Sequence, residues 1–143
     1  MKPMILLVDD EAMLREVIGD VLVKEGFACI PCANGPDAMR LIDAGPYKFD
    51  LLLSDVKMPG TVDGFEVAER FKAKYPEGTV ILLSGYIDEK AAGSLSRDRV
   101  RVLPKPLRAQ ELLDAVKEAL ALASVMSEGS NVTPLDPNSP RSQ

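Results

Sequence analysis

Five short apolar runs, separated by longer amphipathic segments, constrain the fold of this chain more than any other feature of its sequence. Each run is too brief for a helix and ends at polar residues, which is typical of a strand buried on both faces of a sheet. The five predicted strands are residues 2–8, 27–30, 50–54, 79–83 and 100–103.

Between these runs, apolar residues recur at the spacing of helices with one buried side. Asn34 and Asp63 stand where helix N-caps are expected, and Gly45-Pro46 marks a helix end. The predicted helices are residues 11–24, 34–45, 63–75, 87–95 and 107–125. Five strands alternating with five helices predict an α/β fold, a doubly wound five-stranded parallel sheet covered on both faces.

The last part of the chain differs in composition from the rest. After Met126 the sequence is rich in Ser, Asn, Pro and Gly and has no hydrophobic periodicity, which is typical of disorder. We therefore expect one domain over residues 1–125 and a disordered, Pro/Ser-rich tail over residues 126–143. No second folded domain is expected, so the protein would act as a stand-alone unit.

Composition and charge exclude several classes of function. The 143 residues include no histidine, which excludes Ser-His-Asp and Cys-His catalysis and zinc sites that use imidazole. The net charge of −5 argues against a broad nucleic-acid contact. No apolar run reaches the roughly 18 residues that cross a bilayer, and the first run is too short for a signal peptide. We expect a cytoplasmic protein without nucleic-acid or membrane partners.

Cys29 and Cys32 form a C-x-x-C pattern. Such a pair can be redox-active or half of a zinc site, but the chain has no second cysteine pair to complete a zinc site. Cys29 also falls within a predicted strand, whereas a reactive thiol usually lies exposed at a helix start. We favour a packing role for both cysteines.

Polar side chains follow four of the predicted strands. In an open α/β sheet, ligands bind at the carboxyl ends of the strands, so these residues are expected at one edge. Carboxylates that converge there repel each other unless a cation lies among them, and hard oxygen ligands suit Mg²⁺. The residues are Asp9, Asp10 and Glu11 after the first strand, Asp55 after the third, Ser84 after the fourth and Lys105 after the fifth.

Each of these residues alone has an ordinary explanation, as a helix cap, a solvated strand end or a turn residue. Together they provide a carboxylate nucleophile, a divalent cation site, an amine and a hydroxyl. That set is sufficient for phosphoryl transfer, in which the protein mainly positions groups and neutralises charge.

Over about residues 2–123 the sequence resembles the receiver domain of bacterial two-component response regulators. Five motifs occur in the expected order on the expected strands, and the set is far more specific than any one of them. The resemblance implies a flavodoxin-like receiver fold and a phosphorylation switch. The motifs are Val8-Asp9-Asp10-Glu11, Ser54-Asp55-Val56-Lys57-Met58-Pro59-Gly60, Asp63-Gly64, Ser84-Gly85 and Lys105-Pro106.

The resemblance also implies roles for the acidic residues. Asp55 would be the phosphoacceptor and a ligand of Mg²⁺. Asp10 would bind the ion directly, Asp9 would contribute through water, and the backbone carbonyl of Lys57 would be a further ligand. The Lys57 side chain would lie near the path of an attacking water and so affect the lifetime of the phosphorylated state.

Ser84 would hold a phosphoryl oxygen and signal its arrival, and Lys105 would pair with the phosphoryl group. The peptide bond between Lys105 and Pro106 is usually cis in this family. The chain departs from the family at the fifth strand, where Val102 replaces the usual aromatic switch residue, and we suggest Tyr86 as a substitute. The segment from 59 to 63 is also one residue longer than the common pattern.

The function expected from the resemblance is a stand-alone receiver that is not a metabolic enzyme but promotes its own phosphorylation and dephosphorylation. A sensor histidine kinase or a histidine phosphotransfer protein would be the donor, and an unidentified protein would receive the signal. The alternatives are a hybrid-kinase receiver or phosphorelay intermediate, an aspartate-based phosphatase and a flavodoxin-like cofactor binder. The phosphatase is disfavoured because Lys57 stands where a second acid is usual, and the cofactor binder because no Gly-rich loop follows the first strand.

Overall fold

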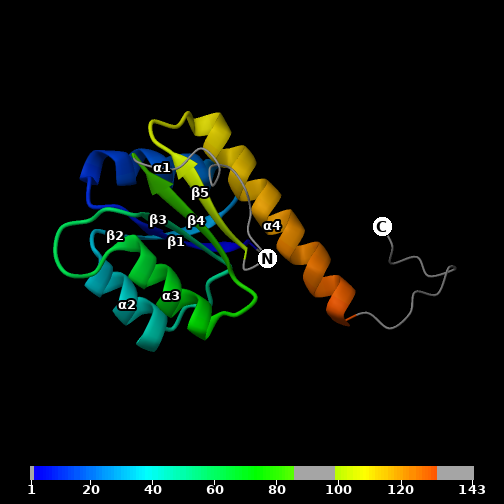
Figure 1. Cartoon of the computed structure of the whole chain (residues 1–143). Helices are drawn as coiled ribbons and strands as arrows, with labels where there is room; N and C mark the ends of the chain where they lie inside the picture. The colour runs from blue at the N-terminus through cyan, green and yellow to red at the C-terminus, as the bar shows by residue number, and fades with distance from the viewer. Residues whose placement is uncertain (1, 86–98, 132–143) are drawn as a thin grey trace, which may run out of the picture.

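The computed structural model describes residues 2–85 and 99–131, and its centre is a five-stranded parallel sheet (Figure 1). The strand order is β2-β1-β3-β4-β5, so the chain turns to opposite sides of β1 for its second and third strands. The strands are β1 (Met4–Val8), β2 (Ala28–Cys32), β3 (Leu51–Asp55), β4 (Thr79–Ser84) and β5 (Val100–Pro104). The sheet predicted from the sequence is confirmed.

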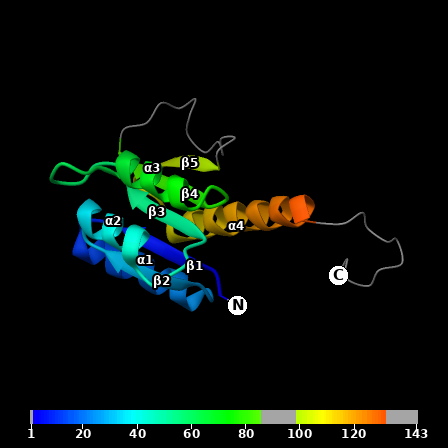
Figure 2. The ribbon, with the colours of Figure 1, turned by 90° about the horizontal axis from the view of Figure 1, so that it is seen from below.

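Helices cover both faces of the sheet, with α1 and α4 on one face and α2 and α3 on the other (Figures 1 and 2). The fifth predicted helix is the element labelled α4. The predicted helix 87–95 lies outside the described residues. The helices are α1 (Ala12–Lys24), α2 (Gly35–Ala44), α3 (Gly64–Lys74) and α4 (Ala109–Asn131).

The apolar runs form buried strands because each face of the sheet has its own core. Successive side chains of a strand point to opposite faces. Ile5 and Leu7 of β1 therefore pack with α1 and α4, whereas Leu6 and Val8 pack with α2 and α3. All four are fully buried or nearly so, which explains why the strand shows no polar alternation.

Capping side chains determine where two of the helices begin. The Asn34 side chain accepts a hydrogen bond from the Asp37 backbone N–H at the start of α2, as predicted. Asp63 and Glu66 form a reciprocal capping box at the start of α3. This second cap matters for function because α3 begins shortly after β3 and fixes the end of the loop between them.

The last helix is longer than its hydrophobic pattern predicts. It continues to Asn131, whereas the sequence places its end near Val125. Residues 132–143, which make up the rest of the predicted disordered tail, lie outside the described residues. The domain boundary at residue 125 therefore stays a prediction.

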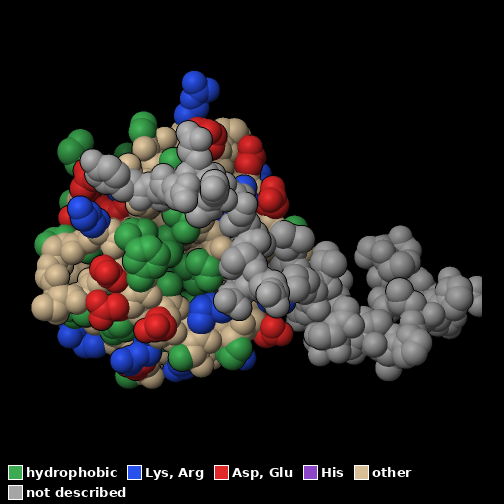
Figure 3. Space-filling model, in the orientation of Figure 1, with side chains coloured by type: hydrophobic (Ala, Val, Ile, Leu, Met, Phe, Trp, Pro, Cys, Tyr) green, Lys and Arg blue, Asp and Glu red, His purple; other side chains and the backbone are tan. Residues whose placement is uncertain are grey.

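The surface of the described residues carries mixed charge. On the face shown in Figure 3, Lys and Arg side chains are scattered, and an apolar area lies between acidic side chains. No helix among residues 2–85 and 99–131 is long and apolar enough to cross a membrane.

The two cysteines of β2 point to opposite faces of the sheet. Cys29 packs against the core beneath α1 and α4, whereas Cys32 is buried in the core beneath α2 and α3. Burial raises the pKa of each thiol to about 11. Both are free cysteines, which supports the packing interpretation.

We expect neither cysteine to react readily in the native protein. A pKa near 11 lowers the thiolate fraction at neutral pH about a hundredfold relative to a free thiol, so alkylation by iodoacetamide should be slow until the protein is unfolded. Intact mass after treatment with glutathione disulfide should show no internal disulfide. Loss of two hydrogens under native conditions would contradict the packing interpretation.

Candidate functional site

The candidate site lies at the carboxyl ends of β1 and β3, where the strand order reverses. The two strands are paired in parallel, with Val8 opposite Ser54. Asp9 directly follows Val8, and Asp55 follows Ser54, so the register places these two acids side by side. Ligands of open α/β sheets bind at this kind of position.

Three carboxylates meet here, as the sequence predicts. Asp9, Asp10 and Asp55 each place one oxygen within 4.8 Å of the oxygens of the other two. Asp9 and Asp55 are buried, with 1% and 5% of their surface exposed, while Asp10 is exposed. The cluster therefore has a buried base and one side open to solvent.

Three of the polar groups of Asp9 make hydrogen bonds. Its N–H donates to the carbonyl of Cys32 at 3.1 Å, and its Oδ1 accepts from the N–H of Glu11 at 2.8 Å. Its backbone carbonyl accepts from Nη1 of Arg15 at 2.7 Å. The remaining carboxylate oxygen, Oδ2, is buried and has no hydrogen-bond partner among the described residues.

Lys105 supplies the positive charge of the site. It follows the last residue of β5, and its N–H donates to the carbonyl of Ser84 at 2.8 Å. Its Nζ lies 2.5 Å from Oδ1 of Asp55 in a largely buried ion pair. The peptide bond between Lys105 and Pro106 is cis.

Burial dominates the electrostatics of the two buried acids. It raises the pKa of Asp55 to about 6, even though the hydrogen bond from Lys105 acts in the opposite direction. The charges of Asp9 and Asp10 add to the increase. Burial also raises the pKa of Asp9. The pKa of Lys105 is raised as well, because the hydrogen bond and charge of Asp55 outweigh the effect of burial.

The residues of the cluster fit a divalent cation. Three carboxylates supply hard oxygen donors, and the buried Oδ2 of Asp9 needs a partner that the described residues do not provide. A cation among the three would also offset their mutual repulsion. Mg²⁺ matches such an oxygen-only set, in which water can occupy further positions on the open side.

Ser84 and Val102, two other predicted site residues, lie on the neighbouring strands. Ser84 is partly buried and ends β4, directly after Leu83, which pairs with Asp55. Val102 lies on β5 opposite Leu82 and packs against the core beneath α2 and α3. Tyr86 lies outside the described residues.

Lys57 lies in the loop between β3 and α3, and its side chain is exposed. Its predicted role as a carbonyl ligand stays a prediction. Gly60 in this loop has a φ of +98°, a backbone conformation that favours glycine. Met58 and Val62 anchor the loop in the core beneath α2 and α3. Val62 lies so close to Gly35 that a Cβ added there would be 2.6 Å from its Cγ1.

Two residues near the site acquire a role only in the structure. The N–H of Gly64 donates to the carbonyl of Val56 at 2.8 Å, and a Cβ on Gly64 would lie 2.1 Å from the backbone oxygen of Asp55. The Asp63-Gly64 motif identified this glycine, but the reason for a glycine there is visible only in the structure. No sequence pattern pointed to Arg15, because its contact with Asp9 depends on the direction in which α1 leaves the sheet.

Together, the fold and the site define a flavodoxin-like α/β protein with an aspartate–lysine centre at the carboxyl edge of its sheet. The pattern of the response regulator receiver domain matches residues 5–117, which is most of the chain. The chain therefore belongs to the receiver domain family of two-component signalling.

Individual relatives agree with this assignment. Sporulation initiation phosphotransferase F of Bacillus subtilis is 33% identical over 130 residues, covering 87% of this chain and 98% of that protein. Sensor kinase CckA of Brucella abortus is 31% identical over 117 residues, covering 81% of this chain and 12% of that protein. The chain also spans 46% of the positive alginate biosynthesis regulatory protein of Pseudomonas aeruginosa, at 34% identity.

Solved structures show the same fold. The response regulator receiver protein from Sinorhizobium medicae matches with a TM-score of 0.76 and 26% identity, covering 85% of this chain and 97% of that one. The receiver domain of the hybrid histidine kinase CckA matches with a TM-score of 0.70 and 31% identity, covering 82% and 98%. Like these domains, the chain is a signalling module of the receiver type.

Proposed function

We propose that this protein is a phosphorylation-activated switch that accepts a phosphoryl group on Asp55 in the presence of Mg²⁺. One observation carries the proposal: the Asp55 carboxylate lies between two further carboxylates and an ammonium group 2.5 Å away. The carboxylates suit a cation, and the ammonium suits the oxygens of an incoming phosphoryl group. Phosphoryl transfer depends mainly on positioning and charge neutralisation, and these groups can supply both.

The chemistry follows from the positions of the side chains. An oxygen of Asp55 bonds to phosphorus while the bond from phosphorus to the donor nitrogen breaks, and the leaving imidazole takes a proton from solvent. Lys105 pairs with the transferred group, and the Ser84 hydroxyl donates to one of its oxygens. Asp9, Asp10 and Asp55 would hold Mg²⁺, with the Lys57 carbonyl as a further ligand. The ion would supply charge neutralisation for the phosphoryl oxygens.

The 143 residues include no histidine, so a phosphohistidine donor has to lie outside this sequence. A sensor histidine kinase or a histidine phosphotransfer protein fits this requirement. The surface beside the site suits such a partner. Met13 and Val17 of α1 are 83% and 56% exposed, although both are apolar.

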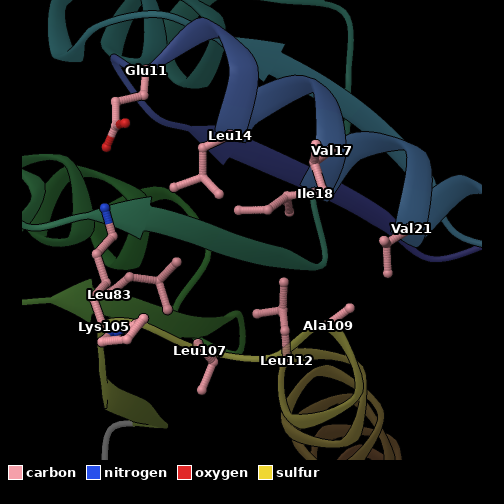
Figure 4. A pocket seen from close by; sticks show the side chains of 11 residues that line it. Glu11, Leu14, Val17, Ile18, Val21, Leu83, Lys105, Leu107, Ala109 and Leu112 are labelled. Carbon is pink, nitrogen blue, oxygen red and sulfur yellow. The ribbon is translucent and has the colours of Figure 1, made fainter.

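An apolar cavity of about 370 Å³ lies between α1 and the start of α4, next to these side chains (Figure 4). Leu14 and Ile18 line it from α1, and Leu112 lines it from α4. At one end the Glu11 carboxylate and the Lys105 amine point toward one another. A donor helix that places apolar side chains in this cavity would bring its histidine close to Lys105 and Asp55.

The output is proposed to be a protein–protein contact. Phosphorylation would add about −1.5 to −2 charge to a site that is already acidic. The resulting change would reach the surface formed by β5, α4 and the predicted helix 87–95. The cytoplasmic location predicted from the sequence stays a prediction.

A phosphorelay intermediate is the second candidate. The observation that favours it is the match to a sporulation phosphotransferase over 98% of that protein's length. Such a protein would pass its phosphoryl group on to a histidine of another phosphotransfer protein instead of acting on a target directly. Measuring phosphoryl flow from the phosphorylated chain to candidate phosphotransfer proteins distinguishes the two.

Incubation with Mg²⁺ and acetyl phosphate tests the proposed function. Intact mass should increase by one phosphoryl group in the wild-type protein and not in Asp55→Asn. Asp20→Asn, which changes an exposed acid on α1, should behave as the wild type. Removal of Mg²⁺ with EDTA should prevent the increase. A phosphorylated Asp55→Asn protein, or a wild type that gains no mass, would overturn the proposal.

A further inference from the structure

Arg15 reaches from α1 back to the loop that carries the first two acids. It lies in the first turn of the helix, where side chains lean toward the helix N-terminus. Its backbone N–H makes the helical bond to Glu11, while its guanidinium donates to the carbonyl oxygen of Asp9 at 2.7 Å. The Arg15 residue is half-buried, and its hydrogen bond connects the first part of α1 to the loop that precedes the helix.

The carbonyl that Arg15 holds belongs to the peptide linking Asp9 to Asp10. Fixing this carbonyl fixes the orientation of that peptide, and so the direction in which the chain enters Asp10. Asp10 is exposed, yet its carboxylate lies within 4.8 Å of two buried ones. Like charges at this distance repel, so a loop free to move would carry Asp10 away from the cluster.

The N–H of Asp9 donates toward β2, on the other side of the residue from this peptide. The bond from the Glu11 N–H to Oδ1 of Asp9 spans the peptide as an Asx-turn, but it does not reach the carbonyl. Among the described residues, the Arg15 guanidinium makes the one hydrogen bond to the Asp9 carbonyl. The Oδ2 of Asp9 is buried and has no hydrogen-bond partner among the described residues, as expected of an atom that would bind a cation.

We propose that Arg15 is a positioning residue for the metal site, holding the peptide between Asp9 and Asp10 so that both carboxylates are preorganised for a divalent cation. This inference rests on the proposed Mg²⁺-dependent function. Residues that orient metal ligands typically change metal affinity by about 10–100-fold when they are removed. Arg15→Ala should therefore weaken Mg²⁺ binding about tenfold or more.

A purely structural role would give a different result. It would lower the stability of the metal-free protein and leave the affinity of the folded protein for Mg²⁺ unchanged. A positioning role weakens Mg²⁺ binding and has a small effect on metal-free stability, because the released loop can relieve the repulsion among the carboxylates.

The experiment is a Mg²⁺ titration followed by isothermal calorimetry or by amide NMR shifts, together with urea unfolding without metal. Arg15→Lys should bind Mg²⁺ with an affinity between those of the wild type and Arg15→Ala, because an ammonium can reach the carbonyl with poorer geometry. Arg40→Ala is the matched control, since Arg40 is an exposed arginine on α2 that pairs with Asp37. It should bind Mg²⁺ as the wild type does.

The outcomes separate this inference from the function on which it rests. Wild-type binding of Mg²⁺ with an Arg15→Ala affinity within twofold of it would overturn the inference alone. A wild-type protein that binds no Mg²⁺ would overturn the proposed function and the inference with it. A tenfold loss in Arg15→Ala, with little change in Arg40→Ala, supports the positioning role.

Discussion

Asp55→Asn is expected to make the metal-free protein more stable at pH 7, although the same change removes the proposed phosphoacceptor. Burial raises the pKa of Asp55 from 3.8 to about 6, so the folded protein holds a charged carboxylate that it disfavours at neutral pH. That shift corresponds to about 3 kcal/mol at pH 7. Asparagine resembles the protonated acid, and urea unfolding should show a gain of about 2–3 kcal/mol.

The pH dependence identifies the cause of this gain. An acid with a raised folded-state pKa contributes stability that is present below its unfolded pKa, near 4, and is lost as the pH rises through about 6. The difference between Asp55→Asn and the wild type should therefore shrink toward zero between pH 6 and pH 4. Asp20→Asn should change stability by less than about 0.5 kcal/mol throughout.

Mg²⁺ should reverse the order of stability. A ligand that binds only the folded state stabilises it, so saturating Mg²⁺ should raise the melting temperature of the wild type and have a much smaller effect on Asp55→Asn. If Asp55→Asn is less stable than the wild type at pH 7 without metal, burial does not raise the pKa of the Asp55 carboxylate.

Gly64→Ala is expected to have the largest effect of any single methyl addition near the site. The new Cβ would lie 2.1 Å from the backbone oxygen of Asp55 and 2.8 Å from Cα of Val56. Both atoms belong to backbone at the end of a central strand, which cannot move without displacing Asp55. We expect a loss of about 3 kcal/mol or more in urea unfolding.

Phosphorylation of Asp55 should also be slower. A displacement of about 1 Å at the reacting group can cost on the order of 100-fold in rate, so Gly64→Ala should react with acetyl phosphate at least that much more slowly per folded molecule. Gly19→Ala is the control within α1. Its Cβ would meet only Cδ2 of Leu7 at 4.0 Å, and it should gain about 0.5–1 kcal/mol from helix propensity. Normal phosphorylation of Gly64→Ala would refute the close-contact argument.

Much of the fold follows from local sequence signals. A strand buried on both faces has to be apolar throughout, so β1 and β3 stand out without any partner being known. Asn34 and Asp63 mark helix starts because their side chains satisfy N–H groups within the same turn. The end of α4 was less well predicted, because no capping residue or proline stops it at Val125.

The residues of the site were also predictable, for a topological reason. All five strands are parallel, so the residues that follow them meet at one edge whatever the details of packing. Asp9, Asp10 and Asp55 do lie together, and Lys105 does pair with Asp55. The role of Tyr86 in place of an aromatic residue at Val102 stays a prediction.

The order of strands and helices along the chain, and the set of polar residues that follow the strands, were therefore predictable from the sequence, because both depend on neighbours in the chain. The burial of Asp9 and Asp55, the close contact at Gly64 and the bond from Arg15 to the Asp9 carbonyl became visible in the folded structure. Burial and close contact depend on residues that are distant in sequence, and no local pattern records those distances.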